Sequence, residues 1–214
     1  AEGFSRAASM LSAERRYTSL VPTQLKRLLD QAPVDEFLHR QLKRFDAILV
    51  GGQAIDPALK TQAKELDVNL VASYGMSETC GGCVYDGIPL DGVELKLDEE
   101  GQILIRGPLL ADRVADAEGW YHTNDLGQFD SRRKLSVIGR TNRVLNSGGL
   151  KVSLDAIETA IREIGGVADA AAVALADAEW GERAAVVYVG SPEVADFIAG
   201  EALLSLGAPA KPVR

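Results

Sequence analysis

The 214-residue sequence has few of the residues that build disulfide-rich, zinc-binding or membrane-spanning proteins. Its two cysteines, Cys80 and Cys83, are too few for a disulfide framework. A zinc site needs four ligands, and neither of the two histidines, His39 and His122, is spaced as a partner of the cysteine pair. No apolar run approaches the roughly 20 residues of a membrane helix, and no signal peptide is recognised. These absences favour a cytoplasmic protein without a membrane span.

Basic residues are also under-represented, because 23 lysines and arginines face 31 acidic residues and leave a net charge of -8. This charge argues against nucleic acid and against anionic membrane surfaces as partners. It does not exclude a nucleotide, since a small basic pocket can exist inside an acidic protein. The apolar share of 46% and the charged share of 25% are ordinary for a globular protein.

Residues 1–72 alternate between helical and strand-like patterns. The segment PTQLKRLLDQ (22–31) places three leucines on one helical face. FDAILVGGQAI (45–55) is a short apolar run ending at Gly51 and Gly52, typical of a buried parallel strand before a tight turn. PALKTQAKEL (57–66) predicts a helix and VNLVASYG (68–75) a second buried strand. This order predicts a βαβ unit, whose ligands bind at the carboxyl ends of the strands.

The remaining sequence changes character twice. GVELKLDEEGQILIRG (92–107) predicts a β-hairpin, and residues 86–140 are expected to form a small antiparallel sheet or barrel. Further on, Ser153 should cap a helix, strands are expected at 167–177 and 183–190, and a second helix at 191–207. We therefore expect two domains. Residues 1–140 would combine a βαβ layer (1–85) with a β-barrel-like part (86–140), and 141–214 would form a small α+β domain.

The cysteine pair lies in a segment that allows two interpretations. Cys80-Gly-Gly-Cys83 is a C-x-x-C pair of the kind used in redox or metal sites. A thioredoxin-like pair opens a helix, whereas Gly81 and Gly82 favour a flexible loop. Two reduced side chains lining a pocket are the favoured interpretation.

The preceding residues, YGMSET (74–79), favour a nucleotide. Tyr74 can stack on a purine, Gly75 allows close backbone approach, and Thr79 offers a hydroxyl and an N–H group to a phosphate. Glu78 supplies an oxygen ligand of the type that Mg²⁺ prefers. The alternative is a strand-end turn with solvated polar residues.

Two further segments carry residues suited to a nucleotide. GWYHTNDLG (119–127) places Asp125 after a strand, and the two oxygens of its carboxylate match the vicinal hydroxyls of a ribose. GRTNRVLNSGGLKVS (139–153) contains Arg140, a glycine pair at 148–149 and Lys151; the guanidinium group suits ribose or phosphate oxygens. An isolated aspartate or arginine is usually structural, but three such segments in this order favour a nucleotide site.

These segments resemble the adenylate-forming acyl-CoA synthetase superfamily of AMP-binding enzymes. The resemblance rests on YGMSET (74–79), on the Y-x-T-x-D pattern of residues 121–125, and on GRTNRVLNSGGLKV (139–152). TSLVPTQLKRLL (18–29) and residues 74–93 are most similar to the o-succinylbenzoate–CoA ligases of menaquinone biosynthesis. The resemblance implies the second half of a large adenylate-forming domain, followed by a small mobile C-terminal domain.

The resemblance also implies a two-step reaction. A small-molecule carboxylic acid attacks Mg·ATP to give an acyl-adenylate and pyrophosphate, and the thiolate of coenzyme A then displaces AMP. Implied catalytic residues are Thr79 at phosphate, Glu78 at Mg²⁺ and Arg140 on the nucleotide. Implied binding residues are Gly51, Gly52 and Gln53 beside adenine and the acyl pocket, Tyr74 and Gly75 at adenine, Asp125 at the ribose, Gly149 in the pantetheine tunnel, and Lys151, which could equally be a surface charge.

The sequence departs from the family pattern in several places. Asn142 stands where the family commonly has an aspartate hinge, and Asn124 replaces the usual glycine before Asp125. No Ser/Thr/Gly-rich phosphate loop ending in lysine occurs upstream, and the chain stops at AKPVR, before the Gly-Lys segment whose lysine drives adenylation. The chain also starts with Ala1 rather than methionine. We therefore expect a piece of a longer protein with little adenylation activity of its own.

Three other functions remain open at this point. The acid could be another aryl or fatty acid, or the acceptor could be a carrier protein rather than coenzyme A. The third alternative is a non-catalytic module that binds AMP or an acyl-AMP. The sequence also leaves a homo-oligomer open.

Overall fold

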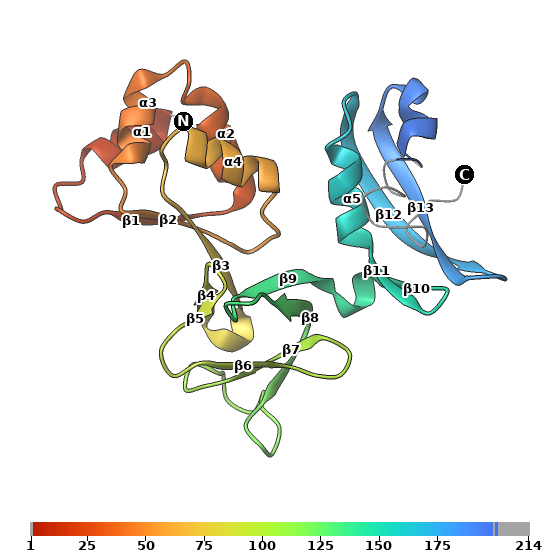
Figure 1. Ribbon diagram of the computed structural model, residues 1–214. Helices are drawn as coiled ribbons and strands as arrows, with labels where there is room; N and C mark the ends of the chain where they lie inside the picture. The colour runs from red at the N-terminus through yellow and green to blue at the C-terminus, as the bar shows by residue number, and fades with distance from the viewer. Residues whose placement is uncertain (1, 199, 201–214) are drawn as a thin grey trace. The chain divides into compact units, whose positions relative to one another are not determined.

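The computed structural model describes residues 2–198 and 200, and its elements are shown in Figure 1. The helices are α1 (Glu2–Ser9), α2 (Pro22–Gln31), α3 (Glu36–Lys43), α4 (Pro57–Glu65) and α5 (Leu154–Arg162), with 3₁₀ turns η1 (Ser77–Thr79), η2 (Thr141–Arg143) and η3 (Pro192–Val194). The strands are β1 (Tyr17–Leu20), β2 (Ala47–Val50), β3 (Leu70–Met76), β4 (Gly81–Tyr85), β5 (Ile88–Pro89), β6 (Glu94–Leu97), β7 (Gln102–Arg106), β8 (Tyr121–Phe129), β9 (Leu135–Arg140), β10 (Val144–Ser147), β11 (Leu150–Ser153), β12 (Val167–Asp177) and β13 (Gly181–Gly190). None of the helices within this described part is long and apolar enough to cross a bilayer.

The chain forms two compact units. The first comprises Ala1–Leu95, Ile105–Tyr121 and Asp130–Leu135, and the second comprises Lys96–Leu104, His122–Phe129 and Ser136–Arg214. The expected boundary between domains after residue 140 stays a prediction.

The sheet of the first unit confirms the βαβ prediction. Its strand order is β1-β2-β3-β4-β5, with β1, β2 and β3 parallel and β4 and β5 antiparallel. Helices α2 and α3 connect β1 to β2, and α4 connects β2 to β3. Parallel neighbours need such crossovers because their ends lie on opposite edges of the sheet. All three parallel strands therefore end at the same edge.

The helices of this unit begin where the sequence provides a cap. Pro22 occupies the first turn of α2, and Asp56 precedes Pro57 in α4. The Asp56 carboxylate accepts a hydrogen bond from Ala58 N at 2.8 Å, and Asp35 accepts one from Leu38 N at 2.9 Å. Each cap is worth about 1 kcal/mol. The apolar faces that these helices present are buried in one core, formed by Ala8, Leu25, Leu28, Leu29, Ala32, Leu38, Leu42, Phe45, Ile48, Val50, Leu59, Ala63 and Val68.

A four-stranded sheet follows, in the order β6-β7-β8-β9. The predicted hairpin at 92–107 is confirmed by β6 and β7, whose turn is closed by Asp98. Its carboxylate accepts hydrogen bonds from Glu100 N at 2.9 Å and Gln102 N at 2.8 Å. Asp125 was expected after a strand, but β8 continues through it to Phe129. The side chain of Asp125 is therefore presented by a strand rather than by a loop.

The C-terminal sheet has the strand order β11-β10-β13-β12, and α5 packs against it. Ser153 caps α5 as predicted, because its hydroxyl accepts a hydrogen bond from Ala156 N at 3.2 Å. Ile157 and Ile161 are fully buried over the alanine-rich face of β12. Of the helix expected at 191–207, residues 195–198 are helical after η3, and residues 199 and 201–207 lie outside the described part.

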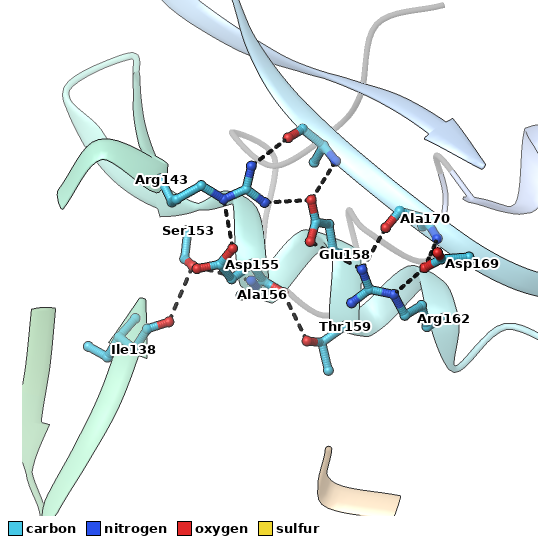
Figure 2. A network of polar contacts seen from close by, with 11 residues as sticks. Ile138, Arg143, Ser153, Asp155, Ala156, Glu158, Thr159, Arg162, Asp169 and Ala170 are labelled. Atoms are coloured by element: carbon cyan, nitrogen blue, oxygen red, sulfur yellow. Dashed lines mark hydrogen bonds and ion pairs between the residues drawn. The ribbon is translucent and has the colours of Figure 1, made fainter. Parts of the chain in front are cut away.

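A network of charged side chains joins α5 to its neighbours (Figure 2). Glu158 is at its centre, with a side chain only 12% exposed. Its carboxylate accepts hydrogen bonds from Arg143 at 2.5 Å, from Arg162 at 3.3 Å and from Ala172 N at 2.7 Å. Because a buried carboxylate is stable only when its oxygens are paired, these three donors keep it charged inside the unit.

The pKa of Glu158 gives a pH-dependent prediction. Burial raises this pKa, but the Ala172 N–H and the two guanidinium groups outweigh burial, and the pKa is lowered. A lowered carboxyl pKa stabilises the fold fully above the unfolded value of about 4.3, and the stabilisation is lost as the pH falls through the folded pKa. We expect Glu158→Gln to lower the free energy of unfolding at pH 7 by about 1–3 kcal/mol.

The same substitution should flatten the loss of stability between about pH 5 and pH 3, the range in which carboxylates protonate. Urea unfolding of the parent and the variant at a series of pH values measures this. Glu163→Gln, at an exposed position one residue after α5, is the control. Equal pH slopes for the parent and Glu158→Gln would contradict the prediction.

Candidate functional site

A cavity of about 380 Å³ lies at the carboxyl ends of the parallel strands in the first unit. Its walls come from the ends of β1, β2 and β3 and from β4. The lining residues are Ser19, Leu20, Val21, Gln24, Leu49, Gly51, Gly52, Ser73, Gly75, Met76, Gly81, Gly82 and Tyr85. This is the edge at which the sequence predicted a ligand.

Glycines shape this cavity. A Cβ atom on Gly51 would lie 2.6 Å from the carbonyl oxygen of Ser73, and one on Gly75 would overlap the backbone of Gly81. Gly52 has a φ of +81°, a conformation that glycine adopts without strain. The tight turn predicted at Gly51 and Gly52 is therefore present, and the backbone of β3 approaches β4 more closely than any side chain would allow.

Two hydroxyl groups converge on the same wall. A Cβ on Gly82 would overlap Ser73 Oγ and would lie 2.7 Å from Tyr85 Oη. Sequence reasoning missed both residues, because only strand pairing brings β3 and β4 together here. Tyr74 and Gln53 were expected at this site, but neither is among the described residues that line the cavity. Side chains alternate between the two faces of a strand, and Ser73 and Gly75, on either side of Tyr74, both line the cavity, as does Met76 at the end of β3.

The two hydroxyl residues in the turn after β3 differ in burial: Thr79 is buried and Ser77 is exposed. Thr79 is 2% exposed, and its Oγ1 accepts a hydrogen bond from Met76 N at 2.9 Å and lies 2.7 Å from the Gly81 carbonyl oxygen, to which it donates. Ser77, at the start of η1, is exposed. Glu78 between them is half-buried, and its carbonyl oxygen accepts a hydrogen bond from Ala111 N at 2.8 Å. Ser77 is thus the exposed hydroxyl residue of this turn. Sequence reasoning did not select it, although its position directly before Glu78 could have indicated a contact with the same ligand.

The cysteines form neither a disulfide nor a metal site. Both are free thiols; Cys80 is exposed and Cys83 is buried at a bulge where β4 has one residue more than β3. Burial raises the pKa of the Cys83 thiol, which makes it less reactive. Within the described residues no group of three or more His, Cys, Asp or Glu side chains could hold a metal ion. The glycines between the cysteines line the cavity, and the cysteines themselves do not.

Asp125 and Arg140, from separate motifs, meet in the second unit. Arg140 is the last residue of β9, and its Nε lies 3.4 Å from Asp125 Oδ1 on β8. The arginine side chain is 68% exposed, whereas that of Asp125 is 14% exposed. Asn124 is not among the described residues with positive φ, so asparagine can replace the usual glycine without strain. A largely buried carboxylate and an exposed guanidinium are therefore presented side by side.

The remaining predicted residues follow Arg140 in the chain. Asn142 is exposed in η2. Gly149 has a φ of +82° in the turn between β10 and β11, with open space around its Cα. Lys151 is exposed on β11 and lies 3.2 Å from Glu100. The predicted residues are thus found in two groups, one in each compact unit, with Gly51, Gly52 and Gly75 in the first and Asp125 and Arg140 in the second.

Comparison with known proteins identifies the relatives of this arrangement. Residues 13–113 match the family model described as AMP-binding enzyme. Over these residues the chain is similar to AMP-binding enzymes. A probable 2-succinylbenzoate–CoA ligase from Mycobacterium tuberculosis is 38% identical over 194 residues, which covers 86% of this chain and 49% of the relative. The 2-succinylbenzoate–CoA ligase of Escherichia coli is 30% identical over 198 residues, covering 85% of this chain and 42% of the relative.

Solved structures of AMP-binding enzymes have the same fold. Escherichia coli MenE with a bound OSB-AMS analogue matches with a TM-score of 0.71 at 27% identity, covering 97% of this chain and 48% of that one. The o-succinylbenzoate CoA synthetase of Bacillus subtilis, in complex with the acyl-adenylate OSB-AMP, matches with a TM-score of 0.84 at 23% identity, covering 98% and 48%. The expected fold class is confirmed. The chain spans about half the length of these AMP-binding relatives.

The glycine wall of the cavity gives a second prediction. Gly75→Ala would place a methyl group against the Gly81 carbonyl, and backbone rather than a flexible side chain would have to move. We expect a loss of stability of about 1–3 kcal/mol, the usual effect of overpacking. Gly165→Ala is the control, because nothing lies within 4 Å of its added Cβ. Chemical unfolding of both variants measures the difference, and equal stabilities would show that β3 and β4 can separate freely.

Proposed function

We propose that this chain is part of an acid–CoA ligase that forms an acyl-adenylate from ATP and a carboxylic acid and then a CoA thioester. The supporting observation is the 38% identity to the probable 2-succinylbenzoate–CoA ligase of Mycobacterium tuberculosis, over 194 residues. On this ground the acid is 2-succinylbenzoate, an aromatic acid with a second carboxylate.

Asp125 and Arg140 form the nucleotide-binding part of the proposal. The Asp125 carboxylate would accept hydrogen bonds from the ribose hydroxyls, as a charged acceptor does with vicinal donors. Arg140 is held at 3.4 Å on one side and is 68% exposed, so its remaining N–H groups can turn toward a ribose or phosphate oxygen. Two charged groups on neighbouring strands suit the polar end of AMP.

The cavity of the first unit suits the acyl group and the adenine. Its wall of glycine backbone admits a flat ring, and Leu20, Val21 and Met76 supply apolar contact. Gly51 and Gly52 would border adenine, with Gln53 beside them. Tyr74, on the other face of β3, would stack on the purine only if adenine approaches from that face. The hydroxyls of Ser73 and Tyr85 offer hydrogen bonds to a polar group on the acid.

The turn after β3 would bind the phosphates and Mg²⁺. Glu78 is a carboxylate in a half-buried position, and one such group fits Mg²⁺, which binds through one or two carboxylates together with waters and phosphate oxygens. When bound, Mg²⁺ would neutralise charge on the phosphates. The phosphate contact predicted for Thr79 stays a prediction. We add Ser77, an exposed residue of a turn whose backbone is fixed by the hydrogen bond from Met76 N to Thr79 Oγ1.

The second half-reaction would use the C-terminal residues. Gly149 leaves open space where the pantetheine chain of coenzyme A would pass. Asn142 would act as the hinge between the two half-reactions. Lys151 is paired with Glu100 in this arrangement, and it would contact the nucleotide only after that exposed pair separates.

Nucleotide affinity provides the third prediction. We expect Asp125→Asn to weaken AMP binding by roughly 10- to 100-fold, because hydrogen bonds to a charged group contribute about 1.5–3 kcal/mol. Titration calorimetry of the protein that contains this chain measures the affinity. Asp30→Asn, which removes an exposed carboxylate paired with Lys26 on α2, is the control. If Asp125→Asn binds AMP with unchanged affinity, Asp125 does not bind the ribose hydroxyls.

The activity itself is tested with the same protein. ATP–pyrophosphate exchange that depends on 2-succinylbenzoate, followed by thioester formation with coenzyme A, supports the proposal. If ATP–pyrophosphate exchange depends on another acid instead, that acid is the substrate and 2-succinylbenzoate is not. AMP binding without any exchange would favour a non-catalytic module. The 214-residue chain by itself should show little exchange, because it spans 49% of its ligase relative.

A further inference from the structure

Two arginines bracket the segment proposed as a hinge. Arg140, at the end of β9, contacts Asp125 on β8. Arg143, three residues later, ends η2 and contacts the C-terminal elements of the same unit. The guanidinium groups on the two sides of Thr141 and Asn142 are therefore held by different parts of the second unit.

Arg143 is held at three points (Figure 2). Its Nε donates to Asp155 Oδ1 at 2.8 Å and one terminal nitrogen donates to Glu158 Oε1 at 2.5 Å, both on α5. The other terminal nitrogen donates to the Ala172 carbonyl oxygen on β12 at 3.2 Å. Because the guanidinium group is planar and rigid, three contacts in different directions fix its orientation.

The acceptors of Arg143 are themselves fixed. Glu158 is tied to Ala172 N at 2.7 Å, so Arg143 and Glu158 both bond the backbone of the same residue of β12. Asp155 lies in the first turn of α5, two residues after the Ser153 cap. Arg143 is thereby connected to the main helix and the main hairpin of the C-terminal elements.

The residues between the two arginines are less restrained. Thr141 Oγ1 donates to the Asn124 carbonyl oxygen on β8 at 3.3 Å, which places it with Arg140 on the β8 side. Asn142 is exposed and lies one residue before the anchored Arg143. A change in backbone angles at Asn142 would therefore separate the residues tied to β8 from those tied to α5 and β12.

We propose that Arg143 is a positioning residue, which fixes the C-terminal side of the hinge to α5 and β12 so that rotation is confined to Asn142. The proposal rests on the proposed function, in which the two half-reactions need two placements of the C-terminal elements. With Arg143 in place, a rotation at Asn142 carries residues 143–198 as one body. Without it, the start of β10 bends as well, and the C-terminal groups arrive with poor alignment.

Hydrogen exchange of the protein that contains this chain tests the anchor without reference to activity. We expect Arg143→Ala to raise the exchange rates of the Val144 and Leu145 amides by about tenfold, a local opening rather than global unfolding. Arg143→Lys, which keeps the charge but cannot make three directed contacts, should give an intermediate increase. Arg162→Ala removes another donor to Glu158 but keeps the contacts of Arg143 with Asp155 and the Ala172 carbonyl, and it should leave these two amides unchanged.

The half-reactions of the same variants give the second measurement. Arg143→Ala should leave ATP–pyrophosphate exchange within about twofold of the parent and should lower kcat for thioester formation by about tenfold, with partial recovery in Arg143→Lys. Arg162→Ala should change the two rates by the same small factor.

The two measurements separate the anchor from the proposed function. If Arg143→Ala and Arg162→Ala affect the amides equally, Arg143 is only structural and the inference is wrong. Equal losses in both half-reactions of Arg143→Ala also contradict it. If the parent catalyses neither half-reaction but the exchange pattern holds, the proposed function fails and the anchor of the hinge stands.

Discussion

The close approach of the β3 and β4 backbones is the constraint on which the cavity of the first unit depends. Gly75 faces Gly81 and Gly82 at a separation that leaves no room for a Cβ atom. The same pairing brings Ser73 and Tyr85 to one wall and holds Thr79 under the turn. Because backbone rather than side chains forms the wall, the cavity stays open at the strand ends, where the turn residues Ser77 and Glu78 follow directly.

The C-terminal elements, β10 to β13 and α5, have a small core. In the proposed function this core must stay intact while the hinge at Asn142 changes conformation. Leu145, Ile157 and Ile161 are fully buried, but α5 is short, and much of its attachment to β12 is polar. Removing one partner from this partly buried charge network leaves another charge unpaired and costs about 1–3 kcal/mol. The network around Glu158 therefore adds directed contacts between α5 and β12 to the apolar packing of Ile157 and Ile161.

Much of the fold followed from local sequence patterns, and the site followed only in part. The βαβ unit, the Gly51–Gly52 turn and the Ser153 cap each depend on a few consecutive residues, so periodicity and capping predict them. The burial of Thr79, the position of Asp125 within β8 and the contacts of Arg143 depend on strand pairing and on residues up to 29 positions away. Local patterns carry no information about such pairs. Sequence reasoning consequently selected Asn142 as the hinge position and did not select Arg143, the residue after it.

The pairing of the arginines supports Arg140 as the cation available to a ligand in this acidic protein. Arg106 lies 2.5 Å from Glu94, Arg143 lies 2.5 Å from Glu158, and Arg162 lies 2.9 Å from Asp169. Arg140 is held more loosely, at 3.4 Å, and is the most exposed of the four, at 68%. The Asp125 side chain is only 14% exposed, but the contact is long and the guanidinium lies in solvent, so the other N–H groups of Arg140 can turn toward a phosphate or ribose oxygen. Compared with Arg106, Arg143 and Arg162, Arg140 is therefore the guanidinium that can more readily turn toward a nucleotide beside the ribose-binding candidate Asp125.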